Sequence, residues 1–392
     1  MDSLNQRGEI SVETVTSIGE VAAADWNRLT DGQPFLQHEF LLAMEESGCT
    51  GPDTAWLGNH LLMRGAGGQL AGALPLYQKL DSRGEFVFDW GWADAYERAG
   101  LNYYPKLVCA APFTPATGTR LLIASDSPAD TSRRLVQAAI DHAESSGLSS
   151  LHFLFPADSD REPLQNAGLL ERKGCQFHWH NDGYASFDEF LSRFSSAKRK
   201  KARRERRRIA EAGVQFEHLT ADQLSDQDWD AVFEFYARTF YRRGREPYLN
   251  RAFFDQISTT MPSRLIVILA RFEGKPIAVA LCLRGNNALF GRYWGSLADF
   301  HSLHFEACYY QGIEYCIREG LDRFEPGTQG EHKISRGFTP TATWSYHWLA
   351  DPRFRDAVGD FLDRETSHVD AYIDELTDHV PYKRIIETPT DS

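Results

Sequence analysis

The sequence predicts an α/β fold with mixed sheets, in which one kind of α/β domain occurs twice in tandem. Length is the first observation behind this prediction, because 392 residues are enough for two domains of ordinary size. The second is a hairpin pattern, two apolar runs around a glycine-containing turn, at residues 61–74 and again at 265–283. The third is that each hairpin is followed by an amphipathic helical pattern and a short apolar strand.

In the first half, Gly68 lies in the hairpin turn. Apolar residues between 135 and 143 recur at helical spacing, and Gly147 is suited to the left-handed turn past the end of that helix. Residues 151–156 (LHFLFP) then have the pattern of a short buried strand.

The second half repeats this order, with Gly274 in the hairpin turn. Residues 305–317 have helical spacing, Gly320 ends that helix, and a short strand runs into residues 324–326. Ser186 fits a capping box and opens the first helix of this half. We predict one domain at residues 1–183 and a second at residues 184–392.

The first half is longer between matching landmarks. Gly68 and Gly147 are 79 residues apart, whereas Gly274 and Gly320 are 46 apart, so the first half holds 33 extra residues. An aromatic segment rich in Gly and Pro, near residues 85–118, accounts for them. Such an insertion predicts a loop placed over a site.

The composition is that of a folded protein with an acidic balance. Hydrophobic residues make up 42% of the chain and charged residues 25%, which argues against global disorder. The net charge of −13 argues against a protein that coats nucleic acid, DNA included, or anionic membrane with its whole surface. Six scattered cysteines without a CxxC pair predict free thiols. We expect no signal peptide and no membrane span, and a cytoplasmic location.

Positive charge is concentrated in one segment, for which we predict a helix over residues 196–212. From Lys198 to Arg208, nine of eleven residues are basic and one is acidic, so this segment carries +8 and leaves −21 for the rest of the chain. Cations in a first helical turn are disfavoured by the helix dipole, and a bound polyanion would offset that cost. The segment, including Lys198, Arg199 and Lys201, is therefore either a phosphate-binding helix or a solvated basic helix paired with acidic neighbours.

A second candidate site follows the last strand of the second half. Residues 324–338 combine acids, an imidazole, cations and glycines at the end of a strand, where α/β folds build sites. Glu325, Glu331 or His332 could take a proton from an amine. Lys333 and Arg336 could hold phosphate or carboxylate. The alternative is an exposed turn with a surface salt bridge.

The aromatic insertion is the third candidate. Its rings, Trp92, Tyr96 and Tyr104 among them, could form a stacking wall beside Asp94 and Lys106, or could simply pack in the core. Arg292 and Trp294 end a strand of the second half and could face the same cleft.

Metal binding and covalent catalysis find little support. His178 and His180 share a strand face without a third ligand, and His301, His304 and Glu306 are better explained by helix capping or substrate contact. The sequence has no GxSxG, HExxH or GxxxxGK[ST] motif, so serine hydrolase, zincin and P-loop chemistry lack support.

The repeat resembles two tandem acetyltransferase-type (GNAT) domains, as in the Fem family of peptidoglycan-precursor aminoacyltransferases. The segment from Ser195 to Val214 resembles the Fem-type run of Ser, Lys and Arg residues that ends in Gly-Val. The sequence is still more similar to a FemAB-like bacterial family labelled as peptidoglycan biosynthesis or recognition proteins. Its hallmarks lie at residues 91–96 (GWADAY), 104–107 (YPKL), 112–115 (PFTP), 325–333 (EPGTQGEHK) and 336–338 (RGF).

The resemblance implies transfer of an acyl or aminoacyl group to a small-molecule amine by direct attack, without a covalent nucleophile or a tightly bound cofactor. Residues 299–307 lack the glycine pattern of GNAT enzymes that use acetyl-CoA, and the basic helix suits an RNA donor, which makes tRNA a candidate partner. Two alternatives stay open: an acyl-CoA-dependent N-acyltransferase, and a non-catalytic tandem-GNAT protein that binds a cell-wall precursor or RNA.

Overall fold

The computed structural model describes residues 11–297, 300–328 and 330–383, and these residues form two compact units. Each unit is assembled from separate stretches of the chain. Unit 1 comprises residues up to 174, together with 248–262 and 342–370, and unit 2 comprises 175–247, 263–341 and the residues from 371 onward. The boundary that we predict at residues 183 and 184 concerns the sequence repeat, and it stays a prediction.

Unit 1 contains two sheets. One has the strand order β1-β3-β4-β7, and the other continues from β2 through β5, β6 and β8 to β15. The strands of this unit are β1 (Ser11–Val15), β2 (Trp56–Gly58), β3 (His60–Arg64), β4 (Leu70–Leu74), β5 (Leu76–Lys79), β6 (Lys106–Cys109), β7 (Leu122–Ile123) and β8 (Ser150–Leu154). Its helices are α1 (Ala23–Asn27), α2 (His38–Glu46), α3 (Trp90–Arg98), α4 (Thr131–Ser145), α5 (Asp158–Asn166) and α9 (Arg251–Thr260).

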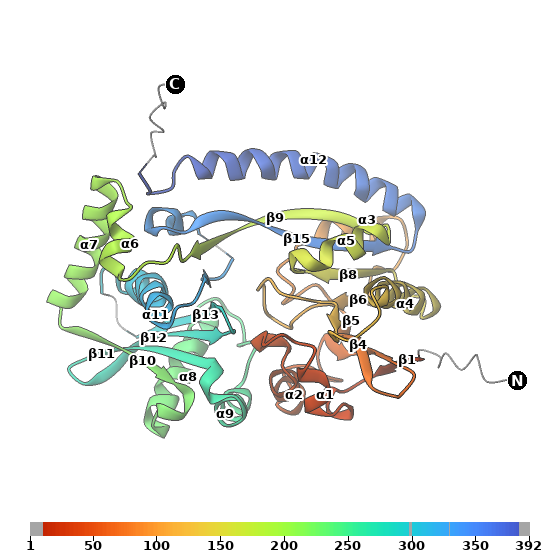
Figure 1. Cartoon of the computed structure of the whole chain (residues 1–392), viewed down its shortest axis with the longest axis horizontal. Helices are drawn as coiled ribbons and strands as arrows, with labels where there is room; N and C mark the ends of the chain where they lie inside the picture. The colour runs from red at the N-terminus through yellow and green to blue at the C-terminus, as the bar shows by residue number, and fades with distance from the viewer. Residues whose placement is uncertain (1–10, 298–299, 329, 384–392) are drawn as a thin grey trace, which may run out of the picture. The chain divides into compact units, whose positions relative to one another are not determined.

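Unit 2 is built on one sheet with the order β10-β11-β12-β13-β14-β9. Figure 1 labels its strands β10, β11, β12 and β13. Its strands are β10 (Val214–Thr220), β11 (Leu265–Phe272), β12 (Lys275–Arg284), β13 (Ala288–Ser296) and β14 (Arg323–Glu325). Its helices are α6 (Phe187–Ser192), α7 (Ser196–Glu211), α8 (Asp226–Tyr241), α10 (Leu303–Phe305), α11 (Gln311–Glu319) and the 3-10 helix η6 (Glu331–Arg336). Two strands and one α-helix contribute residues to both units: β9 (Leu170–His180), β15 (Thr339–Leu349) and α12 (Pro352–Thr377).

The predicted repeat is present in the structure. The hairpin β3–β4 in unit 1 corresponds to β11–β12 in unit 2, and Gly68 and Gly274 have positive φ values of 79° and 76° in the two turns. Each hairpin is followed by a parallel strand pair joined through a helix, β6 with β8 through α4 and β13 with β14 through α11. A helical crossover is what parallel neighbours require.

The insertion is not the loop that the sequence predicts. Residues 90–98 form the helix α3, and the strands β5 and β7 add further regular structure to the first half. Trp92 and Tyr96 are one helical turn apart, so both face the interior, where they pack with Val358 and Leu362 of α12. The apolar face of α3 therefore forms part of the core of unit 1, which is the alternative that the aromatic composition left open.

Candidate active site

The candidate site in unit 2 begins where two parallel strands separate. β13 and β14 are paired from Ala288–Arg323 to Phe290–Glu325, and there β14 ends. β13 continues to Ser296 with β12 as its partner on the other side only, among the described residues. A Cβ on Gly291 would lie 3.2 Å from the Cα of Pro326, so glycine permits the close approach at the point of separation. The loop that follows β14 therefore leaves the sheet beside an open stretch of β13.

Two of the predicted acids on this loop have different surroundings. Glu325 is buried; its Oε1 lies 2.9 Å from Arg323 Nε and its Oε2 lies 3.7 Å from His178 Nε2. Burial, together with the Arg323 charge, lowers the pKa of His178 to about 3, so this imidazole is neutral. Glu331 is exposed and accepts a 2.9 Å hydrogen bond from the Tyr372 hydroxyl. Gln329, within the predicted motif, lies outside the described residues.

His332 is held in an aromatic setting. Its Nε2 lies 2.8 Å from the Tyr309 hydroxyl, and its ring centroid lies 5.6 Å from Phe305 and 6.0 Å from His304. Burial, with the nearby Arg336 and Lys333 cations, lowers its pKa below the ordinary value of 6.5. The imidazole is therefore neutral at pH 7 and can accept a proton.

Lys333 is a buried amine. Its side chain is 1% exposed, and its Nζ donates a 2.5 Å hydrogen bond to the Gly327 carbonyl. Within the described ranges, no carboxylate lies within ion-pair distance of Lys333, and burial lowers its pKa to about 7. An uncompensated cation at this depth favours an anionic ligand or a developing negative charge nearby.

Arg336 is tied to the basic helix. Its Nη2 donates a 2.8 Å hydrogen bond to Glu205 Oε1, and its guanidinium carbon lies 3.4 Å from the centroid of the Phe305 ring. With 2% exposure, this guanidinium already has an internal partner. The role in phosphate binding that the sequence predicts for Arg336 stays a prediction, and the geometry favours a role in holding the loop.

The basic helix forms at the predicted place and carries two kinds of cation. Arg203, Arg206 and Arg207 are paired, with Asp188 at 3.0 Å, Glu306 at 3.0 Å and Glu211 at 3.6 Å respectively. The others have no ion pair within the part of the chain that the structure describes: Lys198, Arg199, Lys200, Lys201, Arg204 and Arg208. Pairing with acidic neighbours, which is one of the sequence alternatives, therefore occurs for part of α7, and phosphate binding by this helix stays a prediction.

A surface pocket of about 350 Å³ lies on the paired side of α7. Phe187, Phe216 and Ile209 give it an apolar floor, and Arg203, Arg207 and other polar groups line its rim. No residue of η6 lines it, so the pocket and the loop after β14 are distinct features of unit 2.

Arg292 and Trp294 lie on the open stretch of β13. The Trp294 ring is 5.4 Å from the His304 ring, which in turn contacts His332, so Trp294 belongs to the same aromatic group. The guanidinium of Arg292 lies 5.3 Å from the centroid of the Tyr293 ring.

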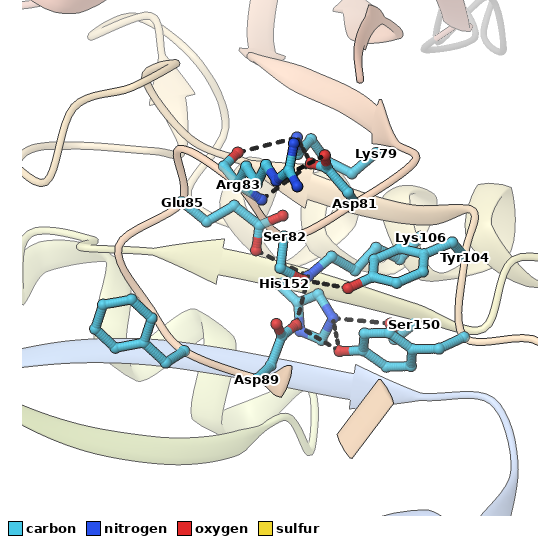
Figure 2. Close-up of polar contacts among 12 residues, drawn as sticks. Lys79, Asp81, Ser82, Arg83, Glu85, Asp89, Tyr104, Lys106, Ser150 and His152 are labelled. Carbon is cyan, nitrogen blue, oxygen red and sulfur yellow. Dashed lines mark hydrogen bonds and ion pairs between the residues drawn. The ribbon is translucent and has the colours of Figure 1, made fainter. Parts of the chain in front are cut away.

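In unit 1, Lys106 is buried rather than exposed to a cleft. Its Nζ donates to Glu85 at 2.8 Å, to Ser82 at 2.9 Å and to Asp89, as Figure 2 shows. Burial raises the pKa of Glu85 to about 7, whereas the Lys106 charge outweighs the burial of Asp89 and lowers its pKa to about 2. The ammonium is fully occupied by this cluster, because its surroundings must compensate a buried charge.

The remaining predicted residues of unit 1 divide by exposure. Trp92 and Tyr96 are buried in the core, the Tyr104 hydroxyl lies 2.7 Å from Ser82 Oγ, and Asp94 is exposed on α3. The structure does not gather these four side chains at one open surface. Their role in acceptor binding stays a prediction.

Sequence reasoning missed two residues of the unit 2 site, Glu205 and Tyr309, whereas His304 is among the residues predicted for helix capping or substrate contact. Glu205 carries a signal, since it is the single acid in a run of nine cations. The described residues contain no group of three or more side chains arranged to hold a metal ion. No helix among them is long and apolar enough to cross a membrane.

Comparisons with known proteins agree on the fold. A family model described as FemAB-like, peptidoglycan biosynthesis/recognition, matches residues 17–384. No curated protein sequence matches the chain. The structure of FemX matches with a TM-score of 0.53 and 11% identity over 89% of this chain and all of that one. The C-terminal DUF2156 domain of a protein assigned as lysylphosphatidylglycerol synthetase from Agrobacterium fabrum gives a TM-score of 0.52 and 14% identity, covering 90% of this chain and 96% of the domain.

Proposed function

The chain belongs to the FemAB-like family, with the tandem GNAT fold, and from this premise we propose that it is a transferase. It would move an aminoacyl or acyl group from an activated donor onto an amine. FemX and the lysylphosphatidylglycerol synthetase domain share its fold, and the family name points to cell-wall precursors as the setting for the acceptor.

One observation carries the proposal. The loop after β14 holds a neutral imidazole, His332, and a buried amine, Lys333, and a buried ion pair joins that loop to the cationic helix α7. A proton acceptor and a phosphate-binding surface are the two things that transfer from a phosphate-bearing donor to an amine requires.

The proposed reaction needs no covalent intermediate on the protein. The amine nitrogen attacks the carbonyl carbon of the donor, and the ester or thioester bond to the carrier breaks. His332 takes the proton that the amine loses, and the carrier oxygen or sulfur leaves and is protonated. The Lys333 ammonium would stabilise the negative charge that develops on the carbonyl oxygen.

The unpaired cations of α7 would hold the donor phosphates. An aminoacyl-tRNA suits them better than acyl-CoA, because a run of unpaired cations along a helix can follow a phosphate backbone. Asp299, in the segment without the CoA-binding glycine pattern, lies outside the described residues.

Transfer from charged tRNA and from acyl-CoA to a panel of amines tests the proposal directly. We expect transfer from charged tRNA and its loss in the double variant Glu331→Gln/His332→Ala. The matched control is Glu234→Gln/His379→Ala, which removes an exposed carboxylate and an exposed imidazole elsewhere in unit 2. Unchanged activity in the first variant would contradict the assignment of the proton acceptor, and binding without turnover of any donor would contradict the transferase.

A further inference from the structure

Glu205 is the acidic residue in the middle of the cationic run, and it faces inward. Ala202, Glu205 and Ile209 form the buried side of α7, with Glu205 only 6% exposed. Its two carboxylate oxygens are both used: Oε1 accepts from Arg336 Nη2 at 2.8 Å and Oε2 accepts from the Tyr310 hydroxyl at 2.7 Å. A carboxylate with both oxygens engaged at this depth is fixed in one orientation.

From Glu205 a short path leads to the proposed proton acceptor. Arg336 donates through its other terminal nitrogen, Nη1, to the backbone carbonyl of His332 at 2.7 Å. The guanidinium is clamped against the Phe305 ring, which also contacts the His332 imidazole. Two hydrogen bonds through one side chain therefore connect the carboxylate on α7 to the backbone of His332.

Stability alone is a weak reason for such a pair. A buried ion pair contributes little net stability, because its attraction is largely offset by the cost of desolvating both charges. Its fixed geometry, by contrast, defines where the loop lies relative to the helix. Glu205 also compensates the Arg336 charge, which would otherwise act in full on the His332 ring.

We propose that Glu205 is a positioning residue, which sets the place and the electrostatic surroundings of His332 through Arg336. The inference rests on the proposed function, since it makes the donor-binding helix and the proton acceptor one rigid assembly. A donor bound along α7 would then present its carbonyl at a fixed distance from the base.

The decisive variant is Glu205→Gln, which keeps the shape and one of the two accepting oxygens and removes the charge. We expect kcat to fall about 10- to 100-fold, because small displacements of a catalytic group have effects of this size, while KM for the donor changes less than threefold. Glu205→Asp should recover part of kcat. The matched control is Glu234→Gln on α8, which removes an exposed carboxylate elsewhere in unit 2 and should leave both constants unchanged.

A second readout does not depend on turnover. The groups that set the charge around His332 are Lys333, Arg336, the neighbouring Glu331 and the His304 ring. Removing the Glu205 charge leaves Arg336 uncompensated, so the pKa of His332, measured by NMR titration of the imidazole, should fall further in Glu205→Gln. If no donor is used even by the wild-type protein, the proposed function fails, and the titration still decides the role of Glu205.

An unchanged titration of His332 in folded Glu205→Gln would overturn the proposal, as would a rise in KM with kcat intact. If Glu205→Gln does not fold, the double variant Glu205→Gln/Arg336→Gln removes both buried charges. A positioning role predicts that kcat stays low in that variant once folding is restored. Recovery of kcat there would show that the pair serves folding alone.

Discussion

The division of α7 into paired and unpaired cations leads to a quantitative prediction about binding of the donor. Arg204 and Arg208 are exposed, four residues apart and without an ion pair among the described residues. Arg203 and Arg207 are also exposed and four residues apart, but they pair with Asp188 and Glu211. Two double variants, Arg204→Gln/Arg208→Gln and Arg203→Gln/Arg207→Gln, therefore differ in pairing and are equal in charge, residue type and spacing.

The expected magnitude follows from counterion release. For single-stranded RNA, each phosphate neutralised by a cation contributes about −0.7 to the slope of log K against log salt. Loss of Arg204 and Arg208 should flatten the slope by about 1.4. The affinity of the variant divided by that of the wild type should therefore be roughly 25-fold lower at 0.1 M salt than at 1 M salt. Arg203 and Arg207 would have to give up existing partners to bind phosphate, so their loss should change the slope by less than about 0.5.

Fluorescence anisotropy of labelled tRNA over a salt series measures these slopes. Equal flattening in the two variants would refute the reasoning, because it would show that α7 acts through its overall charge. No flattening in either would show that the helix does not contact RNA. If the donor is acyl-CoA instead, Arg204→Gln/Arg208→Gln should raise KM for acyl-CoA, and the two double variants should not differ in RNA binding.

Lys333→Met should lose transfer activity yet stabilise the protein below pH 7. The pKa of Lys333 falls from 10.5 to about 7 on folding, so the cost of burying its charge, at most about 5 kcal/mol, is fully present below pH 7 and declines as the pH rises toward 10.5. Urea unfolding at pH 6 and pH 9.5, with exposed Lys275→Met as control, measures the gain in the free energy of unfolding. The gain from Lys333→Met should be larger at pH 6 than at pH 9.5, and equal gains would contradict this prediction. Gly330→Ala should abolish activity, because its Cβ would lie 2.2 Å from the His332 ring, whereas Gly183→Ala meets no atom within 4 Å at a similarly positive φ and should cost only backbone strain. Kinetics and thermal unfolding of the two variants test this, and full activity of Gly330→Ala would mean that the ring position is unimportant. Burial lowers the pKa of His152 to about 3, so between pH 6.5 and about 3 the unfolded chain binds a proton at this imidazole that the folded protein does not. The free energy of unfolding should therefore be highest above pH 6.5 and should decline below it by up to about 1.4 kcal/mol per pH unit. His152→Gln should reduce this slope in urea titrations, and an equally steep slope would rule out His152 as its origin.

The repeat could be predicted from the sequence because its signals are local. Glycines at 68, 274 and 320 adopt positive φ, and the apolar spacing of the helices survives in the structure. The loop after β14 could be found for the same reason, since polar residues and glycines follow directly on an apolar strand.

The burial of individual side chains and their long-range pairing could not be predicted, because they depend on contacts that no local pattern encodes. Tyr96 fits a binding surface and a core equally well, and the packing of α12, more than 250 residues later, decides for the core. Lys106 is buried because Glu85 and Asp89 reach it, and the hydrogen bond between Arg336 and Glu205 spans 131 residues. A charged residue is normally predicted to be exposed, and only its partner in space reverses that expectation.

The discontinuous make-up of unit 1 has a consequence for its biosynthesis. The core of unit 1 includes Phe253 of α9, 5.4 Å from Phe40, and Val358 and Leu362 of α12 beside Trp92. Domains generally fold from the N-terminus while the ribosome is still elongating the chain. Here the unit whose synthesis starts first cannot close its core until residues 342–370 have emerged, when most of unit 2 is already outside the tunnel. A chain whose translation stops after residue 183 would lack the residues of α9 and α12 that cover the aromatic core of unit 1. We expect such a fragment to stay unfolded and to be bound by chaperones or degraded by proteases.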